Sequence, residues 1–124
     1  MANGFTALML TPAAKAAILT AFPAMFSKVV ADHVTVAFNV PATADMPTAS
    51  TVDVVGVSFD DGVQAVVVAV NGSTKRADGS TFHVTVSLAD GRKAKDSNAV
   101  IAAHGFTPVT PFTVDVTPKF VPFK

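Results

Sequence analysis

The tetrapeptide His-Val-Thr-Val occurs twice in this chain, at residues 33–36 and 83–86. Because side chains alternate between the two faces of a β-strand, each histidine shares a face with its threonine while the two valines share the other. Valine and threonine are also among the residues that strands favour. The sequence therefore predicts two strands that each place an imidazole beside a hydroxyl on one face and apolar side chains on the opposite face.

The apolar half of this alternation extends beyond both tetrapeptides. It comprises Val34, Val36, Phe38 and Val40 around the first copy and Phe82, Val84, Val86 and Leu88 around the second. This parity predicts that Phe38 and Phe82 belong to the core. No phenylalanine is therefore singled out as a base-stacking residue.

The doubled motif indicates a particular chemistry. If the two polar faces converge, His33 and His83 supply two proton-transfer groups, and Thr35 and Thr85 supply two hydroxyl donors for one anionic group. Such a set is suited to hydrolysis of a phosphodiester without a metal ion. The alternative is that both segments are ordinary half-buried strands of a non-catalytic binding or structural domain, in which case the two faces need not converge.

Length and composition limit the class of protein. A chain of 124 residues that is 50% hydrophobic is expected to form one domain, residues 1–124, with a core of its own. The nine basic and nine acidic side chains give a net charge of zero, which argues against a protein that tracks long nucleic acids. Any nucleic-acid substrate is therefore expected to be small or to be gripped only at its end.

Neither a targeting segment nor a membrane span is indicated. The alanine-rich start lacks the basic residues and the unbroken apolar run of a signal peptide, because Pro12 and Lys15 interrupt it. No stretch approaches the roughly 18 apolar residues that a membrane span needs. With no cysteine in the chain, the sequence is compatible with a reducing compartment. We expect a cytoplasmic monomer that has no membrane association and no obligate protein partner.

Turn and cap signals divide the chain into elements. We expect strands over 4–10, 28–40, 52–59, 63–70, the second motif and 112–120, helices over 13–22 and from Asp96 or Ser97 to His104, and a mobile loop over 41–50. This order indicates an α+β fold with mostly antiparallel sheets. Because each motif has one helix beside it, we expect a bilobal fold of two duplicated halves, related by a pseudo-twofold axis, around a central cleft.

Basic residues after the second motif and a third histidine are further candidate polar residues. Arg92, Lys93 and Lys95 follow the second motif and form either a phosphate-facing lip or an ordinary solvated loop. His104, next to Gly105 at a helix end, is expected to interact with the helix dipole rather than to act in catalysis. No third metal ligand with recognisable spacing accompanies the paired histidines, so we expect neither a metal ion nor another cofactor.

The two tetrapeptides match in full the paired His-h-Thr/Ser-h motifs, where h is hydrophobic, of the 2H phosphoesterase superfamily, which this chain resembles. The order of elements is similar over most of the chain. Residues 91–98 are similar to the segment at this place in the cyclic phosphodiesterase domains of plant and fungal tRNA ligases. The chain departs from the family in its shorter interval between motifs and in having one helix per half.

This resemblance implies hydrolysis of a 2′,3′-cyclic phosphate, on a nucleotide or an RNA end, to a phosphomonoester that is a 2′-phosphate in some relatives. His33 and His83 would be the acid and base, in an order that the sequence does not assign, and Thr35 and Thr85 would bind the phosphate. An alternative in the same family is cleavage of 2′–5′ or 3′–5′ linked oligonucleotides or of cyclic dinucleotides.

Overall fold

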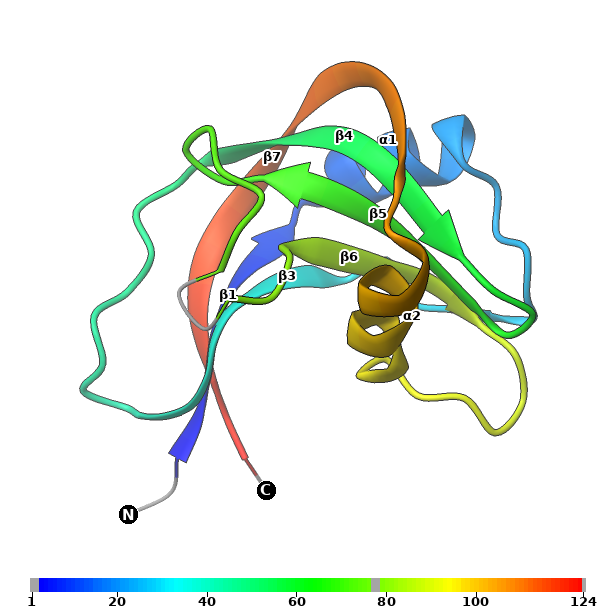
Figure 1. The fold of residues 1–124 in the computed structure, drawn as a ribbon. Coiled ribbons are helices and arrows are strands. Elements are labelled where there is room, and N and C mark those ends of the chain that lie inside the picture. The colour runs from blue at the N-terminus through cyan, green and yellow to red at the C-terminus, as the bar shows by residue number, and fades with distance from the viewer. Residues whose placement is uncertain (1–2, 77–78, 124) are drawn as a thin grey trace.

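The computed structural model describes residues 3–76 and 79–123, which form seven strands and two helices (Figure 1). In chain order the elements are β1 (Asn3–Leu10), α1 (Pro12–Ala21), β2 (Lys28–Val29), β3 (His33–Pro41), β4 (Thr51–Phe59), β5 (Val63–Ala69), β6 (His83–Leu88), α2 (Asp96–His104) and β7 (Thr107–Pro122). Each expected helix and strand has a counterpart in this series.

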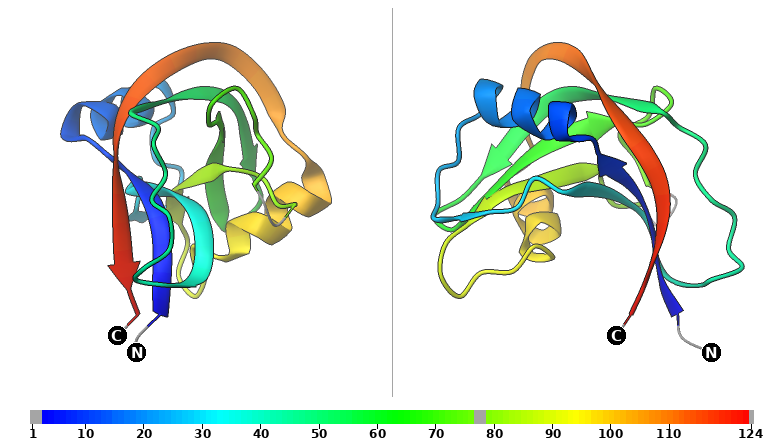
Figure 2. Two further views of the ribbon diagram at one scale, coloured as in Figure 1. Left: turned by 90° about the vertical axis from the view of Figure 1, so that its left-hand side faces the viewer. Right: turned by 180° about the vertical axis from the view of Figure 1, so that it is seen from behind.

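All seven strands belong to one antiparallel sheet in the order β2-β6-β5-β4-β7-β1-β3. The long strand β7 joins the two parts of the sheet, because its first part pairs with β4 and its second part, from Val116, pairs with β1. The sheet curls into a half-barrel, so that the two motif strands, β3 and β6, contact each other although they are not neighbours in the sheet order (Figure 2).

The strand expected over 28–40 is divided in two. The N–H groups of Val30 and Ala31 donate to the carbonyl oxygens of Val86 and Thr85 on β6, at 2.8 Å each. Ala31 then adopts a positive φ of 46°, after which β3 begins and pairs with β1 instead. The break arises because the chain crosses here from one end of the curled sheet to the other, which a single straight strand could not do.

The last strand, β7, is longer than the expected 112–120. It begins at Thr107 and ends at Pro122. Proline lacks the N–H that a sheet needs, so a strand of this length with four prolines is unusual. The pairing of β7 with β4 is interrupted by an irregularity in this region, so not every residue of β7 takes part in the ladder. Phe112 lies opposite Val54 and Pro108 lies opposite Gly56, so residues 109–111 bulge between the two pairs.

The two helices pack on opposite faces of the sheet. Helix α1 contributes Ala14 and Ile18 to the main core, on the valine side of the motif strands. That core also includes Leu8, Val34, Val52, Val54, Val66, Val68, Phe82, Val84, Val86, Val114 and Val116. Helix α2 covers part of the other face, where Ile101 packs against Ala65 and Val67. Val34, Val84, Val86 and Phe82 therefore have the buried positions that the alternation predicts, and Val36 is partly buried against the same core.

The helix caps agree in part with the sequence. The hydroxyl of Thr11 accepts a hydrogen bond from the Ala14 N–H, which makes it the expected N-cap of α1. The N-cap of α2 is Lys95, which precedes both expected residues, Asp96 and Ser97. The difference arises because both side chains have other partners. The Asp96 carboxylate accepts from the Lys93 N–H, and the Ser97 hydroxyl contacts Thr85.

The fold is thus α+β with two helices and a mostly antiparallel sheet, as the sequence predicts. The finer expectation of two duplicated lobes is not shown, because the strands form one continuous sheet. Within the described residues, no helix is long and apolar enough to span a membrane.

Candidate functional site

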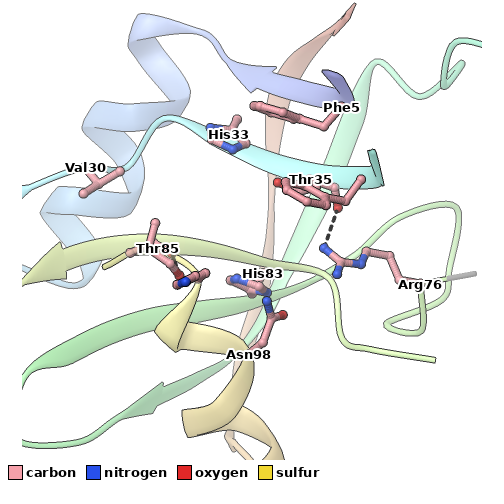
Figure 3. A pocket seen from close by; sticks show the side chains of 11 residues that line it. Phe5, Val30, His33, Thr35, Arg76, His83, Thr85 and Asn98 are labelled. Carbon is pink, nitrogen blue, oxygen red and sulfur yellow. Dashed lines mark hydrogen bonds between the residues drawn. The ribbon is translucent and has the colours of Figure 1, made fainter. Parts of the chain in front are cut away.

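All four residues predicted from the doubled motif line one cavity of about 400 Å³ (Figure 3). His33 and Thr35 reach it from β3, and His83 and Thr85 reach it from β6. The curl of the sheet is what brings these two strands together. The two motif faces therefore converge on one cavity, which is the condition that the proposed paired chemistry requires.

Two bulges in β3 determine which side chains lie on the same face as His33 and Thr35. The pairing with β1 skips Val36 and Asn39, and Asn39 has a positive φ of 58°. The extra residue at Val36 reverses the alternation, so Phe38 joins the face of His33 and Thr35 instead of the core. Phe38 is 64% exposed and lines the cavity, which corrects the expectation that it is a core residue.

The second-motif histidine is held in a defined orientation. Nδ1 of His83 lies 2.9 Å from the carbonyl oxygen of Thr81, and because a carbonyl only accepts, this bond requires the proton on Nδ1. In the neutral ring Nε2 is then the nitrogen available to accept a proton. Burial lowers the pKa of His83, and the positive charges of Arg76 and His33 lower it further, against the raising effect of the Thr81 hydrogen bond.

The first-motif histidine has a different environment. The ring of His33 lies 5.4 Å, centroid to centroid, from the ring of Phe5, which is also part of the cavity wall. Burial lowers the pKa of His33, and the neighbouring Asp32 carboxylate opposes this by favouring the charged form. Both imidazoles are therefore easier to deprotonate than an unperturbed histidine.

The two threonines differ as hydrogen-bond donors. The Thr35 hydroxyl makes no hydrogen bond to any residue that the structure describes. The Thr85 hydroxyl lies 2.8 Å from the Ser97 hydroxyl and 3.3 Å from the Ala94 carbonyl oxygen. Thr35 is thus ready to donate to a ligand, whereas Thr85 already takes part in a network with α2.

The sequence did not single out Arg76 as a site residue, although it is a buried residue of the cavity wall. Its guanidinium donates to the carbonyl oxygen of Thr35 at 3.4 Å, so it links the segment before β6 to β3 (Figure 3). Its charge also acts on His83. No sequence signal marked Arg76 beyond its place on the polar connection that leads into the second motif.

The basic loop after β6 has two different roles. Arg92 is tied to Asp60 at 3.0 Å and to Asp61 and Asp96 at 3.4 Å each, and it does not line the cavity. The Arg92 hydrogen bond lowers the pKa of Asp60. Of the three basic residues in the loop, Lys95 alone reaches the cavity wall. The hypothesis of a phosphate-facing lip therefore applies to Lys95 only.

The third histidine lies apart from the others. His104 occupies the last turn of α2, beside the C-cap Gly105, and does not line the cavity. Among residues 3–76 and 79–123, no three histidine, cysteine or acidic side chains lie close enough together to hold a metal ion.

No family model, curated protein or solved structure matches the chain. The function must therefore be argued from the cavity itself.

Two chemical properties define this cavity. Its wall carries the side chains of Arg76 and Lys95 together with two titratable imidazoles, and none of the lining residues within 3–76 and 79–123 is acidic. It is also partly aromatic, because Phe5 and Phe38 line it and are stacked at a ring separation of 6.3 Å. The arrangement suits a ligand that has both an anionic group and a flat apolar group.

Proposed function

We propose that this protein hydrolyses 2′,3′-cyclic phosphates, on nucleosides or at RNA ends, to phosphomonoesters without a metal ion. The observation that carries the proposal is the convergence of His33, Thr35, His83 and Thr85 on one cavity that also holds two cationic side chains. At about 400 Å³ the cavity lies toward the small end of the usual range for ligand sites. This size favours one cyclic nucleotide over the oligonucleotide and cyclic dinucleotide substrates of the alternative hypothesis.

The chemistry requires one neutral and one protonated histidine. The neutral imidazole removes a proton from water as the water oxygen bonds to phosphorus, and the bond from phosphorus to the ribose 3′ oxygen breaks. The protonated imidazole gives its proton to that oxygen, and the product is a 2′-phosphate. The threonine hydroxyls, Arg76 and Lys95 stabilise the negative charge that develops on the non-bridging oxygens.

Removal of divalent metal ions is expected to leave the activity unchanged. In the proposed reaction two imidazoles move the protons, and hydroxyls and cationic side chains stabilise the charge, so nothing is left for a metal ion to supply. Initial rates on adenosine 2′,3′-cyclic phosphate, measured with and without EDTA, test this. Loss of activity in EDTA that a divalent metal restores would contradict the metal-free mechanism.

Truncation of Phe38 is expected to weaken binding of nucleoside substrates. Its exposed ring lies on the same face as Thr35, at the position where a base could stack, and such stacking contributes about 1–3 kcal/mol per base. Phe38→Ala should therefore raise KM for adenosine 2′,3′-cyclic phosphate by about ten-fold, and it should change kcat much less.

Phe59→Ala is the matched control for this variant. Phe59 is also a strongly exposed phenylalanine, 54% against 64% for Phe38, but it lies on β4 beside a different cavity. The control should leave KM unchanged. Equal effects of the two substitutions, or an unchanged KM in Phe38→Ala, would mean that the base does not contact Phe38.

The remaining expectations stay predictions of the same proposal. The two motif strands come from different parts of the curled sheet, β3 beside β1 and β6 beside β5, which is compatible with a bilobal arrangement around the cavity. A cytoplasmic location and a monomeric state were expected from the sequence. Size-exclusion chromatography with light scattering measures the latter directly.

A further inference from the structure

The Thr85 hydroxyl is held in a buried network between β6 and the first turn of α2. Thr85 is 6% exposed and Ser97 is fully buried, and their hydroxyl oxygens lie 2.8 Å apart. Thr85 also donates to the carbonyl oxygen of Ala94 at 3.3 Å. Either hydroxyl can donate in the 2.8 Å contact, and in the arrangement where Thr85 gives its single proton to Ala94, Ser97 is the donor.

This network withholds the Thr85 proton from the cavity while no anion is bound. An anionic oxygen can receive that proton only if the bond to Ala94 opens. At 3.3 Å this bond is longer than the usual range for an O–H donor, so it is the weaker of the two contacts. The Ala94 carbonyl also keeps a partner when the bond opens, since it accepts from the backbone N–H of Ser97 at 3.1 Å.

We propose that Ser97 is a positioning residue that frees the Thr85 hydroxyl for a phosphate oxygen. Its hydroxyl holds the Thr85 oxygen through a donated hydrogen bond, and its backbone N–H keeps the Ala94 carbonyl satisfied. The donated bond fixes the Thr85 oxygen at the cavity wall and polarises its O–H group, which makes it a better donor to an anion. This inference rests on the proposed function, because it assumes a phosphate in the cavity.

The test is a double-mutant cycle read out as binding of adenosine 2′-monophosphate by calorimetry. Thr85→Val removes a hydrogen bond to the charged phosphate, so it should lower the affinity for adenosine 2′-monophosphate by about ten-fold or more. Ser97→Ala should lower it by a similar factor, and adding Ser97→Ala to Thr85→Val should cause no further loss. Ser97→Cys, which keeps the shape but is a poor donor, should behave like Ser97→Ala.

Ser58→Ala is the matched structural control. Ser58 is another buried serine whose hydroxyl donates to a carbonyl of the α2 region, that of Gly105 at 2.7 Å, but it does not line the cavity. Thermal unfolding should show that Ser58→Ala and Ser97→Ala both lower Tm. The nucleotide affinity should fall in Ser97→Ala alone.

The outcomes separate this inference from the proposed function. If the wild type hydrolyses 2′,3′-cyclic nucleotides and Ser97→Ala binds the nucleotide as tightly as wild type, Ser97 is merely structural. Additive losses in the double variant would overturn the positioning role in the same way. If the wild type neither binds adenosine 2′-monophosphate nor hydrolyses cyclic nucleotides, the proposed function itself is wrong and this inference falls with it.

Discussion

A variant that lacks either cavity histidine is expected to lose about 10²–10⁴-fold in kcat/KM on 2′,3′-cyclic nucleotides. His33→Ala removes one of the two proton-transfer groups, and His83→Ala removes the other. The reaction needs an acid and a base in the same step, so either loss alone should disable it. Steady-state kinetics on adenosine 2′,3′-cyclic phosphate measure this effect, with folding verified by circular dichroism.

The chain offers its own control for these substitutions. His104→Ala removes the one histidine that lies outside the cavity, and it should retain wild-type kinetics. Combining His33→Ala with His83→Ala should cost little more than either change alone, because the two groups act as a unit. If the folded double variant is as fast as wild type, the histidines do not perform the chemistry.

The rate is expected to follow a bell-shaped pH profile whose maximum lies on the acidic side of pH 6.5. Burial lowers the pKa of both imidazoles below the ordinary value of 6.5, and the charge of His33 lowers that of His83 further. The mutual repulsion favours a pair that holds one proton, which is the working state. Away from the maximum, kcat/KM should fall by about ten-fold per pH unit on either side.

Folding must be followed across the same pH range. Because the folded-state pKa of each histidine is lowered, the unfolded chain binds more protons below about pH 6.5, and stability declines as the pH falls through that window. Circular dichroism at each pH separates this loss from the acidic limb of the profile. A rate that rises steadily with pH while the protein stays folded would exclude a protonated histidine as the acid.

The alternation of side chains was enough to predict that each motif histidine shares a face with its threonine. Period-two spacing placed His33 with Thr35 and His83 with Thr85, opposite valines that belong to the main core or pack against it. The Asp60 turn between β4 and β5 was equally local, and the Asp60 carboxylate accepts from the N–H groups of Gly62 and Val63. Signals of this kind depend on neighbouring residues, so they could be interpreted without knowing the fold.

The features that depend on distant segments were not predictable. The bulge at Val36 exists because β3 must pair with β1 while the sheet curls, and it alone moves Phe38 from the core to the cavity. Arg76 reaches Thr35 from 41 positions away in the chain, and the Ser97 contact with Thr85 depends on how α2 docks on the sheet. No local pattern of residue types encodes such contacts.

The two halves of the site are chemically unequal despite their identical tetrapeptides. His33 and Thr35 stand beside aromatic rings, with the Thr35 hydroxyl ready to donate. His83 and Thr85 are each held by a further hydrogen bond, to Thr81 and to the α2 network. Among the described residues, hydrogen bonds thus hold both polar groups of the second motif but not the Thr35 hydroxyl of the first, a difference that the motif alone does not reveal.

The most direct test is to follow adenosine 2′,3′-cyclic phosphate by phosphorus NMR in the presence of EDTA, with wild type and with the His33→Ala, His83→Ala double variant. The signal of the cyclic phosphate should be replaced by that of a single phosphomonoester with the wild type and should persist with the double variant. An unchanged cyclic phosphate with the wild type, or equal conversion by both proteins, would contradict the assignment of this cavity as a cyclic phosphodiesterase site.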